Sequence, residues 1–111
     1  DGPSGYKHYG ATDKGHDGTI APYAMIASVP FVPSLAQEGV HAMARKYAGR
    51  IWGPYGFTSG FNKDRKCYST EYVGIHLGLT ALMLENYYSG FVWKTMMENP
   101  VVREGMRKAK L

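Results

Sequence analysis

The stretch His16-Asp17-Gly18-Thr19-Ile20-Ala21-Pro22-Tyr23 marks the place where a glycine-rich segment passes into a helix. The side-chain oxygen of Asp17 or Thr19 can accept hydrogen bonds from the free N–H groups at the start of that helix. Pro22 suits the first turn of a helix, because the N–H groups there have no hydrogen-bond partner within the helix and a proline therefore loses none. The stretch therefore predicts a helix over residues 19–29, entered through a junction that carries a carboxylate, an imidazole and a phenol.

Outward from this junction, the pattern predicts an all-α segment of about five helices joined by two long loops rich in glycine and aromatic residues. Residues 1–18 hold five glycines and no apolar period, which indicates a loop. Residues 51–69 indicate a second loop, because rings there alternate with Gly and Pro. The other helices are predicted from apolar spacing and from their start signals at residues 33–48, 71–88, 91–97 and 99–109.

The helix predicted over residues 71–88 is apolar on most of its sides, which is typical of a buried helix. Its polar interruptions are His76 and Glu85. A buried carboxylate needs hydrogen bonds or a partner of opposite charge. We therefore expect Glu85 to be either a structural anchor or part of a site, and its distance from the N-terminal end of the helix favours the anchor.

Composition limits what the chain can bind. It has 111 residues, 44% of them hydrophobic, which suits one folded segment rather than a disordered chain.

The formal charge of +4 reflects basic residues near the C-terminus, where the end of a helix favours positive charge. No nucleic-acid-binding module is visible in the sequence. Cys67 is the only cysteine and the four histidines lack metal-site spacing. We expect no metal or other cofactor, no nucleic-acid partner and, without about eighteen consecutive apolar residues, no membrane span.

Several blocks of sequence follow one another in a characteristic order. They are Asp1-Gly2-Pro3-Ser4-Gly5-Tyr6, residues 16–22, Trp52-Gly53-Pro54-Tyr55-Gly56-Phe57 with Phe61-Asn62, Tyr72-Val73-Gly74-Ile75 leading to Leu84-Glu85-Asn86-Tyr87, and Gly90-Phe91-Val92-Trp93-Lys94. This order resembles the C-terminal part of the glycoamylase-like (glucoamylase-like) family, which includes bacterial endo-β-1,2-glucanases and a region of cyclic β-1,2-glucan synthases. The resemblance implies an (α/α)6 toroid of alternating inner and outer helices. Residues 1–111 would form the last third of that catalytic domain.

The same resemblance implies a glucan-active glycoside hydrolase or transglycosylase that acts on a β-linked glucan, with β-1,2 linkages expected. Its partners would be a glucan oligosaccharide or polysaccharide and the remainder of the same polypeptide, in a periplasmic or secreted location. Two positions depart from the family pattern: His76-Leu77 stands in place of an Asp-Gln pair, and Glu71 stands where Asp is usual. These departures leave open the alternative of a non-catalytic carbohydrate-binding or scaffold element with a degenerate acid/base pair.

Glycoside hydrolysis needs two carboxyl groups, one on each side of the scissile bond. Asp17 and Glu71 are the predicted catalytic pair, because each precedes a helix and both can therefore face one cavity. Rings on the loops suit the flat faces of glucose, although packing that anchors a loop explains such rings equally well. The predicted substrate-binding residues are Asp1, Tyr6, His16, Tyr23, Trp52, Tyr55, Asn62 and His76.

Overall fold

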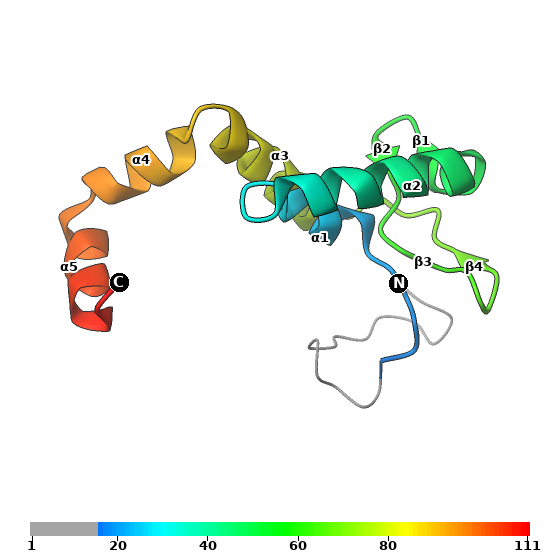
Figure 1. Ribbon diagram of the computed structural model, residues 1–111, viewed down its shortest axis with the longest axis horizontal. Helices are drawn as coiled ribbons and strands as arrows, with labels where there is room; N and C mark the ends of the chain where they lie inside the picture. Colours follow the sequence, from blue (N-terminus) through cyan, green and yellow to red (C-terminus); the bar gives the residue numbers. More distant parts are fainter. Residues whose placement is uncertain (1–15) are drawn as a thin grey trace.

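The computed structural model describes residues 16–111, so the predicted sugar-binding residues Asp1 and Tyr6 lie outside the described residues. The described chain is mostly helical, as predicted, and Figure 1 shows its helices in order along the chain. Their bounds are Pro22–Ala27 for α1, Pro33–Ile51 for α2, Gly74–Tyr88 for α3, Phe91–Glu98 for α4 and Pro100–Ala109 for α5. Short strands occupy part of the segment between α2 and α3.

The segment between α2 and α3 folds into two small antiparallel hairpins, where the sequence predicted only a loop. Strand β1 (Trp52–Gly53) pairs with β2 (Gly56–Phe57), and β3 (Phe61–Asn62) pairs with β4 (Cys67–Tyr68). The first hairpin turns on Gly56, whose φ of 90° favours a residue without a Cβ. Two-residue strands are too short to show the alternation by which strands are recognised in a sequence.

Helix α1 begins later than predicted, and the prediction that Asp17 or Thr19 caps it is wrong. Its N-cap is Ala21, which makes no side-chain cap hydrogen bond. Ile20 instead forms an antiparallel bridge with Phe61, in which the Ile20 N–H donates to the Phe61 carbonyl at 2.7 Å and the Phe61 N–H donates back at 2.9 Å. This long-range pairing holds residue 20 in an extended conformation and so delays the helix to Pro22.

Helices α2 and α5 start where their local signals placed them. Pro33 opens α2, and the Asn99 side chain accepts from the Val101 N–H at 2.9 Å at the start of α5. Helix α2 passes its predicted end at residue 48, because it continues through Gly49 to Ile51, which is fully buried. Packing of that side chain outweighs the helix-breaking tendency of the glycine.

The core lies between α2 and the two hairpins. Its fully buried members are Ile51 and Phe61, with Met43 almost fully buried beside them. The Phe61 ring lies 5.0 Å from the Tyr47 ring and 6.1 Å from the Tyr68 ring, measured between centroids. These contacts hold the β3–β4 hairpin against α2, and Phe57 of the β1–β2 hairpin packs against the same core cluster.

Helix α3 is not buried all round, which corrects the expectation from its apolar sequence. It packs on α1, but Ile75 is 78% exposed, Leu82 is 51% exposed and Asn86 is its only buried residue. Nothing in residues 16–111 covers its outer sides. Glu85 is likewise exposed rather than buried, and it accepts a hydrogen bond from the Ser89 hydroxyl one turn away.

Helices α4 and α5 lead away from the core as an extended arm (Figure 1). The Asn86 side chain accepts from the Trp93 N–H at 2.9 Å and thereby ties α4 to the end of α3. The radius of gyration of 16.2 Å exceeds the roughly 13 Å of a compact chain of this length. The described residues therefore leave an unusually large apolar surface on α3 and α4 without cover.

Candidate functional site

An aromatic pocket of about 440 Å³ lies between α1, α2, the β1–β2 hairpin and α3. Four of the predicted sugar-binding residues line it: Tyr23 from α1, Trp52 and Tyr55 from the hairpin and its turn, and His76 from α3. Its volume is in the usual range for small-molecule sites. The structure thus brings together side chains that are up to 53 positions apart in sequence, from Tyr23 to His76.

The rings of Tyr23 and His76 stack across the pocket wall, with centroids 3.8 Å apart and planes 10° apart. Burial lowers the pKa of His76 below its ordinary value of 6.5. The ring is therefore neutral at pH 7, with one nitrogen that donates and one that accepts a hydrogen bond. Within the described chain its buried Nδ1 atom makes no hydrogen bond.

The β1–β2 hairpin presents rings to solvent at the rim of the pocket. Trp52 is 59% exposed and Tyr55 is 70% exposed. Each is braced by a second ring in an edge-to-face contact, Trp52 by Phe57 at 4.8 Å and Tyr55 by Tyr72 at 5.3 Å between centroids. Exposed rings that are held in place can bind a flat ligand with little loss of side-chain freedom.

Thr58 is a pocket residue that the sequence did not indicate. It follows β2, lines the same pocket and is 6% exposed. Its N–H donates to the Ile51 carbonyl at 2.9 Å, but its buried hydroxyl makes no hydrogen bond within residues 16–111. No local signal separates Thr58 from the other small polar residues of this loop, because its special state depends on neighbours distant in sequence.

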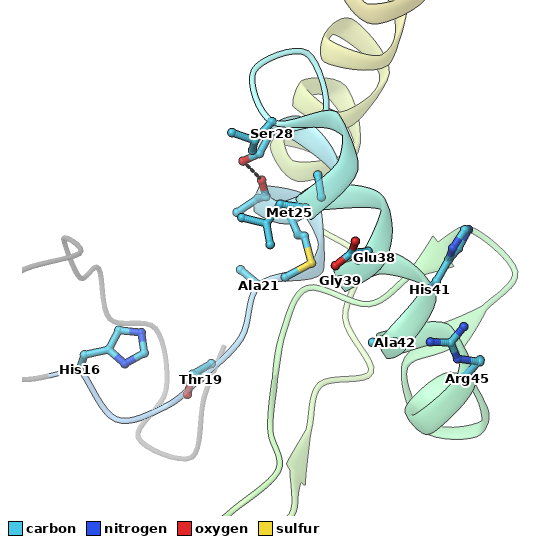
Figure 2. A pocket seen from close by; sticks show the side chains of 14 residues that line it. His16, Thr19, Ala21, Met25, Ser28, Glu38, Gly39, His41, Ala42 and Arg45 are labelled. Atoms are coloured by element: carbon cyan, nitrogen blue, oxygen red, sulfur yellow. Dashed lines mark hydrogen bonds between the residues drawn. The ribbon is translucent and has the colours of Figure 1, made fainter.

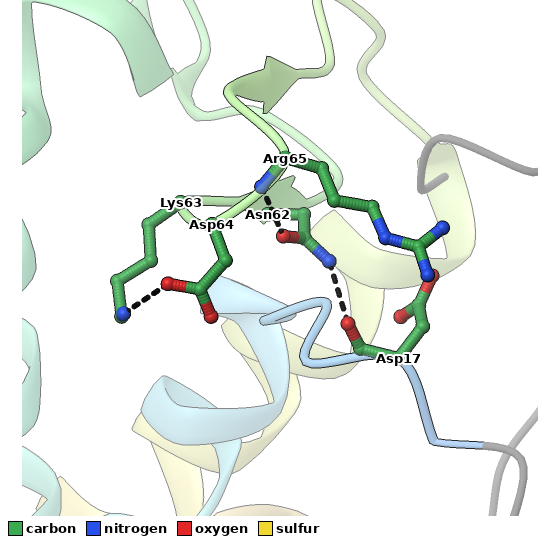
Figure 3. Close-up of polar contacts among 5 residues, drawn as sticks. All are labelled: Asp17, Asn62, Lys63, Asp64 and Arg65. Atoms are coloured by element: carbon green, nitrogen blue, oxygen red, sulfur yellow. Dashed lines mark hydrogen bonds and ion pairs between the residues drawn. The ribbon is translucent and has the colours of Figure 1, made fainter.

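Asn62 joins two loops through its side-chain amide, and its predicted part in sugar binding stays a prediction. Figure 3 shows its amide between Asp17 and Arg65: Nδ2 donates to the Asp17 carbonyl at 2.8 Å, and Oδ1 accepts from the Arg65 N–H at 3.0 Å. The residue is fully buried and does not line the aromatic pocket. Its amide is therefore committed to holding the segment before α1 against the second hairpin.

Asp17 lies at this junction with its carboxylate held by its own turn. The Thr19 N–H donates to Asp17 Oδ1 at 2.9 Å, and hydrogen bonding by Thr19 keeps the pKa of the Asp17 carboxyl below its ordinary value of 3.8. Arg65 adds a smaller effect in the same direction. Asp17 is therefore ionised at neutral pH, which suits a general base or nucleophile rather than a proton donor.

Thr19→Val is expected to raise the pKa of Asp17 toward its ordinary value, because Val removes the hydroxyl that bonds the carboxylate. A lowered folded-state pKa contributes stability above the unfolded pKa, and that stability is lost as the pH falls through the folded value. The variant should therefore lose less stability on acidification than the wild type. NMR titration of the Asp17 carboxyl carbon in the intact protein measures the shift, and an identical midpoint in both proteins would contradict it.

Glu71 belongs to the segment between β4 and α3. Its side chain is exposed, whereas its backbone is tied into the loop by the Ser59 N–H, which donates to the Glu71 carbonyl at 2.9 Å. Neither carboxylate lines the aromatic pocket, and no hydrogen bond or ion pair in the described chain joins the two. The predicted pairing of these residues in catalysis stays a prediction.

His16 lines a second, wider concavity of about 990 Å³, between the segment before α1 and the facing sides of α1 and α2 (Figure 2). His16 Nδ1 accepts from the Gly18 N–H at 3.1 Å. The polar residues of α2 at this concavity, Glu38, His41 and Arg45, are exposed on its solvent side. His16 is thus separate from Tyr23, Trp52, Tyr55 and His76, the four predicted sugar-binding residues that line the aromatic pocket.

Residues 16–111 hold no group of three His, Cys, Asp or Glu side chains arranged to bind a metal ion. Over the same range, no helix has both the length and the apolar character needed to cross a membrane.

Comparison with known proteins places the chain in a family. The Glycoamylase family model, described as "Putative glucoamylase", matches residues 1–100. The exo β-1,2-glucooligosaccharide sophorohydrolase (non-reducing end) of Parabacteroides distasonis is 30% identical over 92 residues, which are 83% of this chain and 13% of that protein.

Two solved structures share the fold. An endo-β-1,2-glucanase from Chitinophaga pinensis, in complex with sophorotriose and glucose, has a TM-score of 0.74 and 33% identity over 82% of this chain and 22% of its own. A protein from Bacteroides caccae with the same description as the family has a TM-score of 0.83 and 28% identity over 96% of this chain and 25% of its own. The chain spans only 13–25% of these three proteins. On the match of the family model over residues 1–100, the chain belongs to the glycoamylase family.

Proposed function

We propose that this chain is the C-terminal segment, about the last third, of the catalytic domain of a glucan-active glycoside hydrolase or transglycosylase. The proposed substrate is a β-linked glucan with β-1,2 linkages, which the names of the Parabacteroides and Chitinophaga relatives support. The observation that carries the proposal is the aromatic pocket, in which Tyr23, Trp52, Tyr55 and His76 converge. A periplasmic or secreted location follows from the same family resemblance.

The pocket is chemically suited to a neutral sugar. None of the described residues that line it is Asp, Glu, Lys or Arg, although the chain as a whole has a formal charge of +4. Rings can stack on the apolar faces of glucose, while hydroxyl, amide and imidazole groups can bind its hydroxyls. A charged ligand would lose its hydration here without gaining a partner of opposite charge.

The uncovered apolar sides of α3 and α4 support a place for this chain inside a larger domain. Exposed side chains there include Ile75 on α3 and Phe91 on α4, which is 60% exposed. The proposed cover is the remainder of the same polypeptide, arranged with this segment as an (α/α)6 toroid of inner and outer helices. Such a cover would give α3 the burial that its apolar sequence predicts.

Within the proposed enzyme, Asp17 acts as the base or nucleophile and Glu71 as the proton donor. The ionised state of Asp17, which its Thr19 hydrogen bond maintains, supports the first assignment. The exposure of Glu71 on the approach to α3 leaves its carboxyl group able to meet a substrate. If either role is instead filled by another part of the polypeptide, the corresponding variant keeps its activity.

Activity of the intact polypeptide on linear β-1,2-glucan tests the proposal. We expect chain cleavage or transfer, seen as a change in the length distribution of the products, with no comparable reaction on a β-1,4-glucan control. Calorimetry with the same oligosaccharides is run in parallel. A protein that neither binds nor converts β-1,2-glucan would contradict the proposal.

A carbohydrate-binding or scaffold element without catalysis is the second candidate. It is favoured by one observation: neither Asp17 nor Glu71 lines the pocket in which the rings converge. His76-Leu77, which stands where the family pattern has an Asp-Gln pair, points the same way. Binding of β-1,2-glucooligosaccharides without turnover by the intact polypeptide would select this function over the first.

Trp52→Ala is expected to weaken binding of β-1,2-glucooligosaccharides by about tenfold, because it removes a braced, exposed ring of a type that often dominates binding. Calorimetry on the intact protein measures the Kd. Trp52→Phe keeps an aromatic face and should retain most of the affinity. Trp93→Ala removes the same residue type outside the pocket and serves as the matched control, and equal affinity in Trp52→Ala and wild type would remove this ring from the site.

A further inference from the structure

Two buried polar atoms at the aromatic pocket lack the hydrogen bonds that buried polar atoms normally make. They are Thr58 Oγ1 and His76 Nδ1, both without a partner in the described chain. Both residues line the pocket, and Thr58 is 6% exposed as a whole. Because a buried hydroxyl or ring nitrogen without a partner is costly, such atoms are rare in folded proteins and call for an explanation.

A bound ligand with hydroxyl groups would supply the missing hydrogen-bond partners of both atoms. The Thr58 hydroxyl can donate and accept, and a neutral His76 ring nitrogen does one or the other according to its tautomer. A sugar hydroxyl is able to match either group. Rotation of Thr58 about its Cα–Cβ bond exchanges its methyl and hydroxyl positions, so the hydroxyl can turn to meet a ligand without movement of the backbone.

The stack with Tyr23 fixes the orientation of the His76 ring, whose plane lies within 10° of the Tyr23 plane. The plane that contains the ring nitrogens of His76 is therefore set before any ligand binds. Thr58 is fixed in turn by its N–H, which donates to Ile51 at the end of α2. Groups held in advance bind a ligand with a smaller loss of conformational freedom.

The same pocket is unsuited to bond cleavage by its own described residues. Glycoside hydrolysis requires two carboxyl groups across the scissile bond, and the described lining holds no Asp or Glu. The pocket therefore fits a sugar unit that is held but not cut. Where the affinity of such a unit is equal in the ground state and the transition state, it lowers KM without raising kcat.

We propose, resting on the proposed function above, that this pocket is a non-cleaving subsite for one glucosyl unit of the glucan. In it, Thr58 Oγ1 and His76 Nδ1 hydrogen-bond the hydroxyl groups of that unit, while Tyr23 and the hairpin rings pack on its faces. Thr58 and His76 are thus substrate-binding residues that raise affinity without entering the reaction.

Thr58→Val tests the subsite, because Val keeps the shape of Thr and loses only the hydroxyl. In the intact protein we expect KM, or Kd by calorimetry, for β-1,2-glucooligosaccharides to rise about tenfold while kcat is unchanged. The thermal midpoint should be equal or higher, since an unsatisfied buried hydroxyl has been removed. Thr58→Ser restores the hydroxyl and should restore KM, and Thr95→Val is the matched control, because Thr95 on α4 does not line the pocket.

His76→Phe is the independent variant, since Phe keeps the stack on Tyr23 and loses both ring nitrogens. It should also raise KM or Kd with kcat retained. A folded Thr58→Val and a folded His76→Phe that both bind like wild type would overturn the subsite, and so would a fall in kcat at unchanged KM. The proposed function fails in a different way: it is contradicted if the wild-type protein neither binds nor converts β-1,2-glucan. The subsite alone is contradicted if the wild type is active and the two variants bind like it.

Discussion

Asp17→Asn in the intact protein is expected to lower kcat on β-1,2-glucan by about 10²–10⁴-fold, the usual contribution of a general acid or base. The carboxylate of Asp17 is ionised at neutral pH because hydrogen bonding by Thr19 lowers its pKa. Asn has the same shape but cannot take up a proton or attack a sugar. Its amide oxygen can still accept from the Thr19 N–H, so the turn should persist and the loss should be catalytic.

The measurement is the initial rate of product formation at saturating glucan. Asp64→Asn is the matched control, because Asp64 is an exposed carboxylate on the turn beside Asn62 and pairs only locally with Lys63 (Figure 3). Glu71→Gln is assayed beside it and should show a comparable fall in kcat if Glu71 is the proton donor. Wild-type rates in both Asp17→Asn and Glu71→Gln would remove these residues from the mechanism and move the catalytic pair to another part of the polypeptide.

Phe61→Ala is expected to destabilise the intact protein by about 3–5 kcal/mol, the usual cost of truncating a fully buried Phe. The ring lies between Tyr47 on α2 and Tyr68 on β4, and its truncation to a methyl group removes both ring contacts. The side chain of Ile20, near Asp17 in the sequence, packs against the same core cluster and loses part of its packing in this variant. Since whole domains are stable by only about 5–15 kcal/mol, the effect should be large.

Denaturant unfolding of the intact protein measures this loss as a fall in the free energy of unfolding. Phe61→Leu nearly conserves the buried volume and should cost less than about 1.5 kcal/mol, which makes it the matched control. A loss below about 1 kcal/mol for Phe61→Ala would show that the core between α2 and the hairpins is not the stabilising centre that its burial indicates.

The chemical character of the site could be read from residue types, but its assembly could not. The sequence predicts Tyr23, Trp52, Tyr55 and His76 as sugar-binding residues, because their rings lie on glycine-rich segments or interrupt an apolar helix. The structure brings these four into one pocket, while it commits Asn62 to a loop junction and places His16 in a separate concavity. No sequence pattern points to Thr58, because the lack of a hydrogen-bond partner for its hydroxyl in the described chain depends on its surroundings rather than on its neighbours in sequence.

The sequence by itself determined the features whose causes are local. Pro33 and Asn99 set helix starts through a missing N–H and a side-chain acceptor, which act within one turn. Only the tertiary structure decided the features that depend on distant partners. Ile20 leaves the first helix because Phe61 pairs with it, and α2 passes Gly49 because Ile51 reaches the core. The apolar sequence of α3 predicts that the helix is buried, but it does not show which surface covers it. That depends on packing between segments far apart in the chain.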